Sequence, residues 1–210
     1  MPVWGGVMPG GDKWEDSYAR RARQEKWLAR SVYKLQEMDK KFQLIRQGDC
    51  LLDLGCSPGS WSQYGIKRVG PGGDVVGMDL KKPDRLSAPN FRFIEADIFK
   101  VDPEWVLKEV GPRDAVISDL APKTTGIHVA DTSRSIELAK GALKIASAVL
   151  KKRGHFLCKV FEGEDLKSYR EALSAYFGQV RSFRPSAIRK SSREIYLLGL
   201  KFKEKSKFTL

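Results

Sequence analysis

The sequence has few of the residues that form disulfides or bind metals: its 210 positions include three cysteines and two histidines. Three is an odd number, and the cysteines lack the spacing of metal ligands, which indicates a reducing compartment. His128 and His155 are too few and too far apart in the sequence to suggest a metal site. We therefore expect reduced cysteines and no metal cofactor.

Long apolar stretches are also absent, since no run of about 18 apolar residues, the length needed to span a bilayer, occurs. The N-terminal stretch MPVWGGVMPGGDKWED lacks the charged and apolar regions of a signal peptide. Both absences predict a cytoplasmic protein that does not enter a membrane.

Negative charge is in deficit, with 26 acidic residues against 38 lysines and arginines and a formal net charge of +12. Such an excess indicates a polyanionic partner, either nucleic acid or an anionic membrane surface. Nucleic-acid binders are the commonest strongly basic soluble proteins, so nucleic acid is the favoured partner.

The chain is long enough for one domain with a sizeable core. We predict a flexible Gly- and Pro-rich segment over residues 1–12 and a single domain over residues 13–210. That domain begins with a basic helical arm over residues 13–30. Ser31 is predicted to cap a second helix, which Gly48 ends.

Strands and helices then alternate, which predicts a doubly wound α/β fold: a Rossmann-like, mostly parallel, seven-stranded sheet with helices on both faces. The last two strands are too close together for a helical crossover and should form an antiparallel hairpin at the sheet edge. The predicted strands are 50–54, 74–79, 91–95, 114–118, 154–160, 179–183 and 194–202, and the helices are 60–69, 103–110, 132–151 and 165–177.

The stretch LLDLGCSPGSW has the form of a strand, a glycine turn and a helix start, which is a nucleotide-binding corner. Ser60 with Gln63 fits a capping box at that helix start. The glycines do not match the dinucleotide or the P-loop pattern, and the D-x-G-x-x-x-G form favours S-adenosylmethionine. The glycines allow close backbone approach to its amino acid end, and Asp53 supplies a polar group. Asp79, at the next strand end, can accept the ribose hydroxyls.

Polar residues at strand ends are the first candidates for a site in an open α/β sheet, because ligands bind beyond those ends. They are Asp53, Asp79, Asp97, Asp119 and Lys159. Of these, Lys159 lies among apolar residues, where a charged amine is costly unless it is paired. From the residues alone, three roles are open: a lysine whose amine extends from an edge position to solvent, a structural ion pair with Asp119, and a catalytic role.

Five motifs in order, ARSVYKL, DLGCSPGSW, SDLAP, KVFEGE and SSREIY, make the chain resemble the FtsJ/RrmJ family of ribosomal RNA 2′-O-ribose methyltransferases. The resemblance implies methylation of a uridine of large-subunit ribosomal RNA and S-adenosylmethionine as cofactor. It also implies a catalytic tetrad of Lys34, Asp119, Lys159 and Glu194. With the residues of the glycine turn, the cofactor contacts implied are Asp53, Gly55, Pro58, Gly59, Trp61, Asp79, Asp97 and Asp119.

The tetrad has a chemical rationale, because a ribose hydroxyl is a weak nucleophile until it loses its proton. We expect Lys159 to be the base that accepts this proton. Lys34 and Glu194 would orient the ribose, and Asp119 would lie between cofactor and base. An amine accepts a proton only when neutral, and the sequence alone leaves the balance of charges around it open.

Basic residues near the tetrad are the candidates for RNA phosphate contacts. Trp14, Tyr18 and Trp27 are expected to anchor the arm in the core, with base stacking as the alternative. The candidate phosphate contacts are Arg20, Arg21, Arg23, Lys26 and Arg30 in the arm, and Arg189, Lys190 and Arg193 near Glu194.

Several other functions remain as alternatives. Relatives that methylate tRNA or mRNA caps share the tetrad, and a non-catalytic ribosome-assembly factor would keep the fold. SDLAP resembles the loop of amino-group methyltransferases but carries Lys123 where those enzymes have an aromatic residue. Cytosine C5 methylation is disfavoured because no cysteine follows a proline. We expect a monomer that binds ribosomal RNA, within the large ribosomal subunit.

Overall fold

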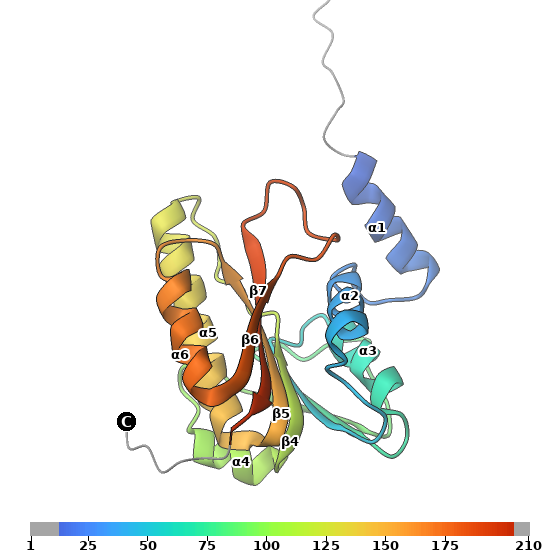
Figure 1. Ribbon diagram of the computed structural model, residues 1–210. Coiled ribbons are helices and arrows are strands. Elements are labelled where there is room, and N and C mark those ends of the chain that lie inside the picture. The colour runs from blue at the N-terminus through green and yellow to red at the C-terminus, as the bar shows by residue number, and fades with distance from the viewer. Residues whose placement is uncertain (1–12, 204–210) are drawn as a thin grey trace, which may run out of the picture.

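The computed structural model describes residues 13–203, with side chains described from residue 17 onward. The flexible segment predicted for residues 1–12, and the side chain of Trp14, lie outside what is described. Within this range, two N-terminal helices precede an alternation of strands and helices (Figure 1).

The sheet has seven strands in the order β3-β2-β1-β4-β5-β7-β6. The strands from β3 to β5 in this order run parallel to one another, and β7 runs antiparallel to both β5 and β6. The predicted fold class is therefore confirmed. The strands are β1 (Cys50–Leu54), β2 (Asp74–Asp79), β3 (Phe91–Glu95), β4 (Arg113–Ser118), β5 (Leu150–Phe161), β6 (Phe177–Phe183) and β7 (Glu194–Phe202).

The antiparallel pair is confirmed, but only β6 of the two is an edge strand, because β7 is inserted between β5 and β6. The burial of each strand explains this order. Residues 196–199 of β7 are all buried, as expected of a strand covered on both faces. In β6, Phe177 and Val180 are buried and most of the other residues are exposed. The last strand of the chain therefore completes the interior of the sheet.

Helices cover both faces of the sheet and form two main hydrophobic layers (Figure 1). One layer lies under α4 (Pro103–Val110), α5 (His128–Val149) and α6 (Leu166–Tyr176). The other lies under α2 (Val32–Phe42) and α3 (Ser60–Val69). The helix predicted from residue 132 begins four residues earlier, and the strand predicted from residue 154 begins at Leu150.

The predicted boundaries of the N-terminal helices are wrong in two places. The basic helix α1 (Lys13–Gln24) stops well before residue 30. The next helix, α2, ends at Phe42, where Gln43 adopts the left-handed conformation with φ 53°, so Gly48 lies beyond it. Ser31 has helical backbone angles and makes no capping hydrogen bond, because its hydroxyl pairs instead with that of Ser60 at 2.9 Å.

The capping box predicted at Ser60 is also wrong, since Gly59 is the N-cap of α3 and no side chain caps it. Gln63 binds the linker between α1 and α2 instead: its Oε1 accepts from the backbone N–H of Leu28 at 3.0 Å, and its Nε2 donates to the carbonyl of Lys26 at 2.9 Å. These bonds dock the linker on α3, the helix that follows the glycine turn.

Aromatic residues of the arm anchor it in the core, as predicted for two of them. Tyr18 and Trp27 pack against a small cluster that includes Val32 and Tyr33. The ring centroids of Tyr18 and Tyr33 lie 5.4 Å apart. The arm is thereby attached to the face of the molecule that carries α2.

Candidate active site

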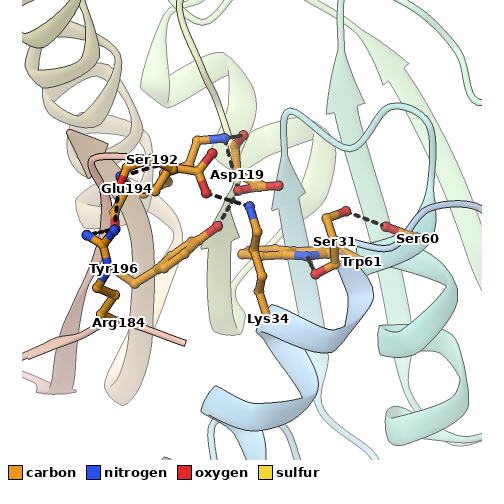
Figure 2. Close-up of polar contacts among 10 residues, drawn as sticks. Ser31, Lys34, Ser60, Trp61, Asp119, Arg184, Ser192, Glu194 and Tyr196 are labelled. Atoms are coloured by element: carbon orange, nitrogen blue, oxygen red, sulfur yellow. Dashed lines mark hydrogen bonds and ion pairs between the residues drawn. The ribbon is translucent and has the colours of Figure 1, made fainter. Parts of the chain in front are cut away.

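Four ionisable residues from distant parts of the chain meet where the parallel strands end (Figure 2). Asp119 follows β4, and Lys159 lies near the end of β5. Because β7 runs antiparallel to β5, its first residue, Glu194, pairs with Phe161 at the same end of the sheet. Lys34 comes from α2. The structure therefore brings together the whole predicted tetrad.

The tetrad forms two ion pairs. The Nζ of Lys159 lies 3.0 Å from Oδ1 of Asp119, and the Nζ of Lys34 lies 2.6 Å from Oε2 of Glu194. Lys159 also donates a hydrogen bond of 2.6 Å to the backbone carbonyl of Asp119. Both lysines are buried, at 6% and 8% relative exposure, so each amine depends on its partner to offset the cost of desolvation.

The carboxyl group of Asp119 is held in its charged form. Burial alone would raise its pKa, but the charges of Lys159 and Lys34, together with hydrogen bonds from Tyr196 and Lys159, lower the pKa below its ordinary value. Asp119 is therefore a carboxylate at neutral pH and serves as a fixed negative charge beside the Lys159 amine.

Tyr196 belongs to this network and was not among the predicted site residues. Its hydroxyl donates a hydrogen bond of 2.7 Å to Oδ1 of Asp119, and its side chain is fully buried (Figure 2). Burial raises the pKa of Tyr196 well above its ordinary value, so the hydroxyl stays protonated and can donate. The available signal was its position two residues after Glu194, because residues two apart on a strand share a face.

A cavity of about 530 Å³ opens beside the network, at the carboxyl ends of β1, β2 and β4. Its lining includes three of the predicted carboxylates, Asp79, Asp97 and Asp119, and also Gly55. The Asp79 carboxylate accepts backbone hydrogen bonds from Ser57 at 2.9 Å and from Lys81 at 3.2 Å. Asp97 accepts one from Phe99 at 3.0 Å. These bonds fix both side chains in place.

The residues present fit S-adenosylmethionine. The carboxylates suit ribose hydroxyls and a positively charged amino group. Leu80 and Phe99 line the same cavity although they are 66% and 62% exposed, and they offer two apolar surfaces for the adenine ring. Gly55 has φ +77°, and a Cβ there would lie 2.7 Å from Cδ2 of Leu120, another lining residue. The close approach therefore requires glycine.

Three other predicted cofactor contacts, Pro58, Gly59 and Trp61, support the glycine turn but do not appear in the cavity lining. Pro58 is exposed, while a Cβ at Gly59 would lie 2.9 Å from the side chain of Leu28 in the linker. The indole of Trp61 is buried and donates a hydrogen bond of 2.9 Å to the carbonyl of Ser31. Their contact with cofactor stays a prediction.

Asp53 lies behind the cavity and has no exposed surface. Its Oδ2 accepts a hydrogen bond of 2.6 Å from the Ser62 hydroxyl, and its buried Oδ1 has no partner among the described residues. Burial raises the pKa of Asp53 to about 7, and the nearby charges of Asp119 and Asp79 act in the same direction. Its contact with the cofactor also stays a prediction.

The candidate RNA contacts lie on α1, on the linker that follows it and on the loop joining β6 to β7, and α1 and this loop project from the same end of the molecule (Figure 1). The loop is fastened to α2 by Glu37, whose Oε2 accepts hydrogen bonds from both the backbone N–H and the hydroxyl of Ser186 at 2.8 and 2.7 Å. The arginines and lysines predicted to bind phosphate are mostly exposed, with Arg30 half-buried in the linker.

Arg21 shows that some of these basic side chains also have structural partners. Its Nε lies 2.7 Å from Oε1 of Glu25, and its guanidinium lies over the ring of Tyr33 at 4.6 Å. In residues 13–203 no helix is long and apolar enough to cross a membrane. No three His, Cys, Asp or Glu residues within that range are grouped to hold a metal ion.

Comparison with known proteins relates this chain to a family of methyltransferases. A family model described as "FtsJ-like methyltransferase" matches residues 27–202. A Bdellovibrio bacteriovorus protein named "Ribosomal RNA large subunit methyltransferase E" is 47% identical over 188 residues, which cover 88% of this chain and 95% of that protein. A protein of the same name from Desulfosudis oleivorans is 44% identical over 194 residues, covering 92% and 94%.

Solved structures agree. A Plasmodium falciparum protein named as a ribosomal RNA methyltransferase superposes with a TM-score of 0.76 at 28% identity, over 85% of this chain and 100% of that one. Fibrillarin from Aeropyrum pernix, solved with bound S-adenosyl-L-methionine, gives a TM-score of 0.54 at 17% identity, over 75% of this chain and 68% of that one. At that identity the likeness concerns the fold alone.

Proposed function

Because this chain belongs to the FtsJ-like methyltransferase family and uses S-adenosylmethionine, we propose that it methylates a ribose 2′-hydroxyl of large-subunit ribosomal RNA, at a uridine. The observation that carries the proposal is the position of the buried Lys159 amine, which contacts an aspartate that itself lines the cofactor cavity. The printed names of the relatives support the choice of large-subunit ribosomal RNA.

Lys159 acts as the general base in this proposal. When bound, the cofactor supplies a methyl group that is already electrophilic, so the reaction depends mainly on alignment and on activation of the hydroxyl. The Lys159 ammonium would first give a proton to solvent, and the resulting amine would accept the hydroxyl proton while the ribose oxygen bonds to the methyl carbon, whose bond to the cofactor sulfur breaks. The proton then leaves Lys159 for solvent, which restores the base.

The other members of the network hold the base and the ribose in place. Asp119 positions the Lys159 amine through its carboxylate and its backbone carbonyl, and Tyr196 fixes that carboxylate. Lys34 and Glu194 form the second ion pair, with which the ribose and its neighbouring phosphate can exchange hydrogen bonds. Each role needs the buried geometry, because these interactions are stronger away from water.

The basic segments on either side of the site would bind the RNA backbone. Phosphate contacts from α1 and from the β6–β7 loop set the register of the RNA. We also propose that the protein works as a monomer in the cytoplasm. Sedimentation of the purified protein, alone and in complex with ribosomal particles, tests the oligomeric state.

The experiment that tests the function compares transfer of a tritiated methyl group to purified large ribosomal subunits, tRNA and capped RNA. We expect label on the large subunit, in a dinucleotide that survives alkaline hydrolysis, because a 2′-O-methyl group blocks attack by the neighbouring hydroxyl. Label only on tRNA or on capped RNA would show that the proposed substrate is wrong. Label found in mononucleotides after alkaline hydrolysis would indicate methylation of a base. Binding without transfer to any of the three would favour a non-catalytic assembly factor.

A further inference from the structure

Arg184, the residue that follows β6, reaches across to the start of β7 (Figure 2). Its Nη1 donates a hydrogen bond of 3.2 Å to the backbone carbonyl of Glu194, and its Nη2 donates to the carbonyl of Ser192. The same guanidinium lies 3.3 Å from Oε2 of Glu162, which follows β5. One side chain therefore joins the ends of three neighbouring strands.

These contacts hold the backbone at Glu194 and at Ser192, two residues before it. The backbone N–H of Glu194 donates a hydrogen bond of 3.2 Å to the Ser192 hydroxyl. The segment that Arg184 contacts, residues 192–194, therefore also has an internal hydrogen bond. Glu194 is the first residue of its strand, and strand ends open more easily than strand centres. Its carboxylate must nevertheless meet Lys34, which lies 160 positions away in the sequence and belongs to a helix outside the sheet.

The guanidinium acts on the backbone and leaves the charge of Glu194 to Lys34. Two carbonyls accept from its two nitrogens, which is the fork geometry that arginine provides and lysine does not. Charge neutralisation at the site is therefore separate from the contact that Arg184 makes. A change at Arg184 would move Glu194 without altering the net charge of the tetrad.

We infer that Arg184 is a positioning residue for methyl transfer, which holds the start of β7 so that the Glu194 carboxylate stays on the Lys34 amine. The inference rests on the proposed function, in which that ion pair orients the ribose. Arg184 acts through Glu194 and does not touch the reacting atoms.

The test is a double-mutant cycle on single-turnover methyl transfer, with enzyme in excess over RNA and with both enzyme and cofactor at saturating concentrations. We expect Arg184→Ala to lower the rate constant about tenfold, a typical effect of losing charge-assisted hydrogen bonds. Once Glu194→Gln has removed the carboxylate, adding Arg184→Ala should change the rate less than about twofold, because residues that act through one another are not additive. Arg181→Ala is the matched control, since that guanidinium contacts the carbonyl of its neighbour Val180 at 3.5 Å, and should leave the rate unchanged.

Other outcomes would overturn the inference. Effects that multiply in the double variant would assign Arg184 a role independent of Glu194, and weaker RNA affinity at an unchanged saturated rate would make it a phosphate contact. A crystal structure of Arg184→Ala gives a second readout, since we expect the Lys34–Glu194 separation to exceed 4 Å, whereas an unchanged distance contradicts the inference.

Arg184→Lys keeps the charge and guards against a variant that fails to fold. We expect it to retain wild-type thermal stability and cofactor affinity while its rate falls about threefold, because an amine cannot hold both carbonyls in the fork geometry. A rate equal to that of the wild type would show that the fork is not needed. An inactive wild-type protein would instead refute the proposed function and is recognised before any variant is compared.

Discussion

At the scale of single residues, Lys159 has surroundings unlike those of the lysines on the surface. Its stem is enclosed by the end of β5, and its amine has two acceptors on one residue, Asp119. A group held at a fixed distance from a carboxylate, beside the cavity that receives the methyl donor, is placed to exchange a proton with a substrate hydroxyl.

Replacing Lys159 by Met keeps the volume and removes the amine. We expect methyl transfer to fall by about 10²- to 10⁴-fold, the range attributed to a general base, while cofactor binding measured by calorimetry persists. Lys123→Met is the control, because Lys123 is exposed in the loop that follows Asp119. Wild-type turnover by Lys159→Met with RNA and cofactor saturating would remove it as the base.

Asp53 predicts a pH dependence of stability. Its pKa is raised by burial from 3.8 to about 7 in the folded chain, so between those values the folded state keeps a proton that the unfolded state has lost. The contribution of this residue to the free energy of unfolding therefore falls as the pH rises from about 4 to about 7, by about 1.4 kcal/mol for each pH unit.

Asp53→Asn, which cannot ionise, should lack this component. Urea unfolding at several pH values measures the free energy of unfolding of both proteins. We expect the difference, variant minus wild type, to increase from pH 4 to pH 7 and to stay constant above pH 7. Two stability curves that run parallel across that interval would contradict a protonated Asp53 in the folded state.

The sequence predicted that Asp119 and Lys159 lie at strand ends, and the ion pair that it allowed between them is present in the structure. Lys34 and Glu194 came from the family resemblance, since no pattern in the chain links two positions 160 residues apart. Tyr196 was missed because a tyrosine within an apolar strand is indistinguishable from an ordinary core residue until its hydroxyl is seen beside Asp119. Hydrogen bonds between distant elements depend on the fold, and the sequence does not display them.

At the scale of elements, the turn between β1 and α3 predicts how the cofactor site tolerates substitution. Gly55→Ala would place a methyl group 2.7 Å from Cδ2 of Leu120 and push that side chain toward the cavity that it lines. We expect a loss of S-adenosylmethionine affinity of about tenfold, in addition to about 1 kcal/mol of backbone strain.

Gly48→Ala separates these two effects. Gly48 has φ +83°, similar to Gly55, but a Cβ there would meet nothing within 4 Å. Both variants should therefore lose a similar amount of thermal stability from strain, while calorimetric titration finds weaker cofactor binding only in Gly55→Ala. Equal affinities in the two variants would show that the approach to Leu120 does not shape the site.

Among the elements, strands were predicted better than helix ends. The β1, β2, β3 and β7 boundaries match the structure, and in β1, β2 and β7 apolar runs bounded by glycine or charge define a largely buried strand. Ser31 is the N-cap residue of α2 as predicted, but neither its hydroxyl nor that of Ser60 makes the predicted capping hydrogen bond, because the two hydroxyls pair with each other. The antiparallel pair at the sheet edge was predicted correctly, whereas the pairing of β7 with β5 was not predicted, since proximity in sequence favours pairing with β6 and says nothing about β5.

At the scale of the whole molecule, the excess of positive charge predicts how RNA binding responds to salt. About three phosphate contacts from α1 and the β6–β7 loop would make affinity fall roughly 20- to 40-fold between 50 and 200 mM salt, through release of condensed counterions. Binding of labelled ribosomal RNA at several salt concentrations measures this slope.

Removing charges at selected positions tests where the RNA phosphates bind. Changing Arg20, Lys26 and Lys190 to Gln should flatten the slope by about one for each phosphate-binding side chain that is neutralised. Lys108→Gln on α4, at the opposite end of the molecule from α1 (Figure 1), should leave it unchanged. A slope that is flat in the wild type would contradict binding through phosphates.

The insertion of β7 between β5 and β6 also bears on biosynthesis. During translation, Lys34, Asp119 and Lys159 emerge from the ribosome before the strand that carries Glu194 and Tyr196. Until that strand emerges, β6 cannot join the sheet, because β7 is the strand that connects it to β5. Lys34 has no Glu194 carboxylate to pair with at that stage. A nascent chain in which β7 has not yet left the ribosome therefore lacks the Glu194 carboxylate and the Tyr196 hydroxyl that complete the polar network.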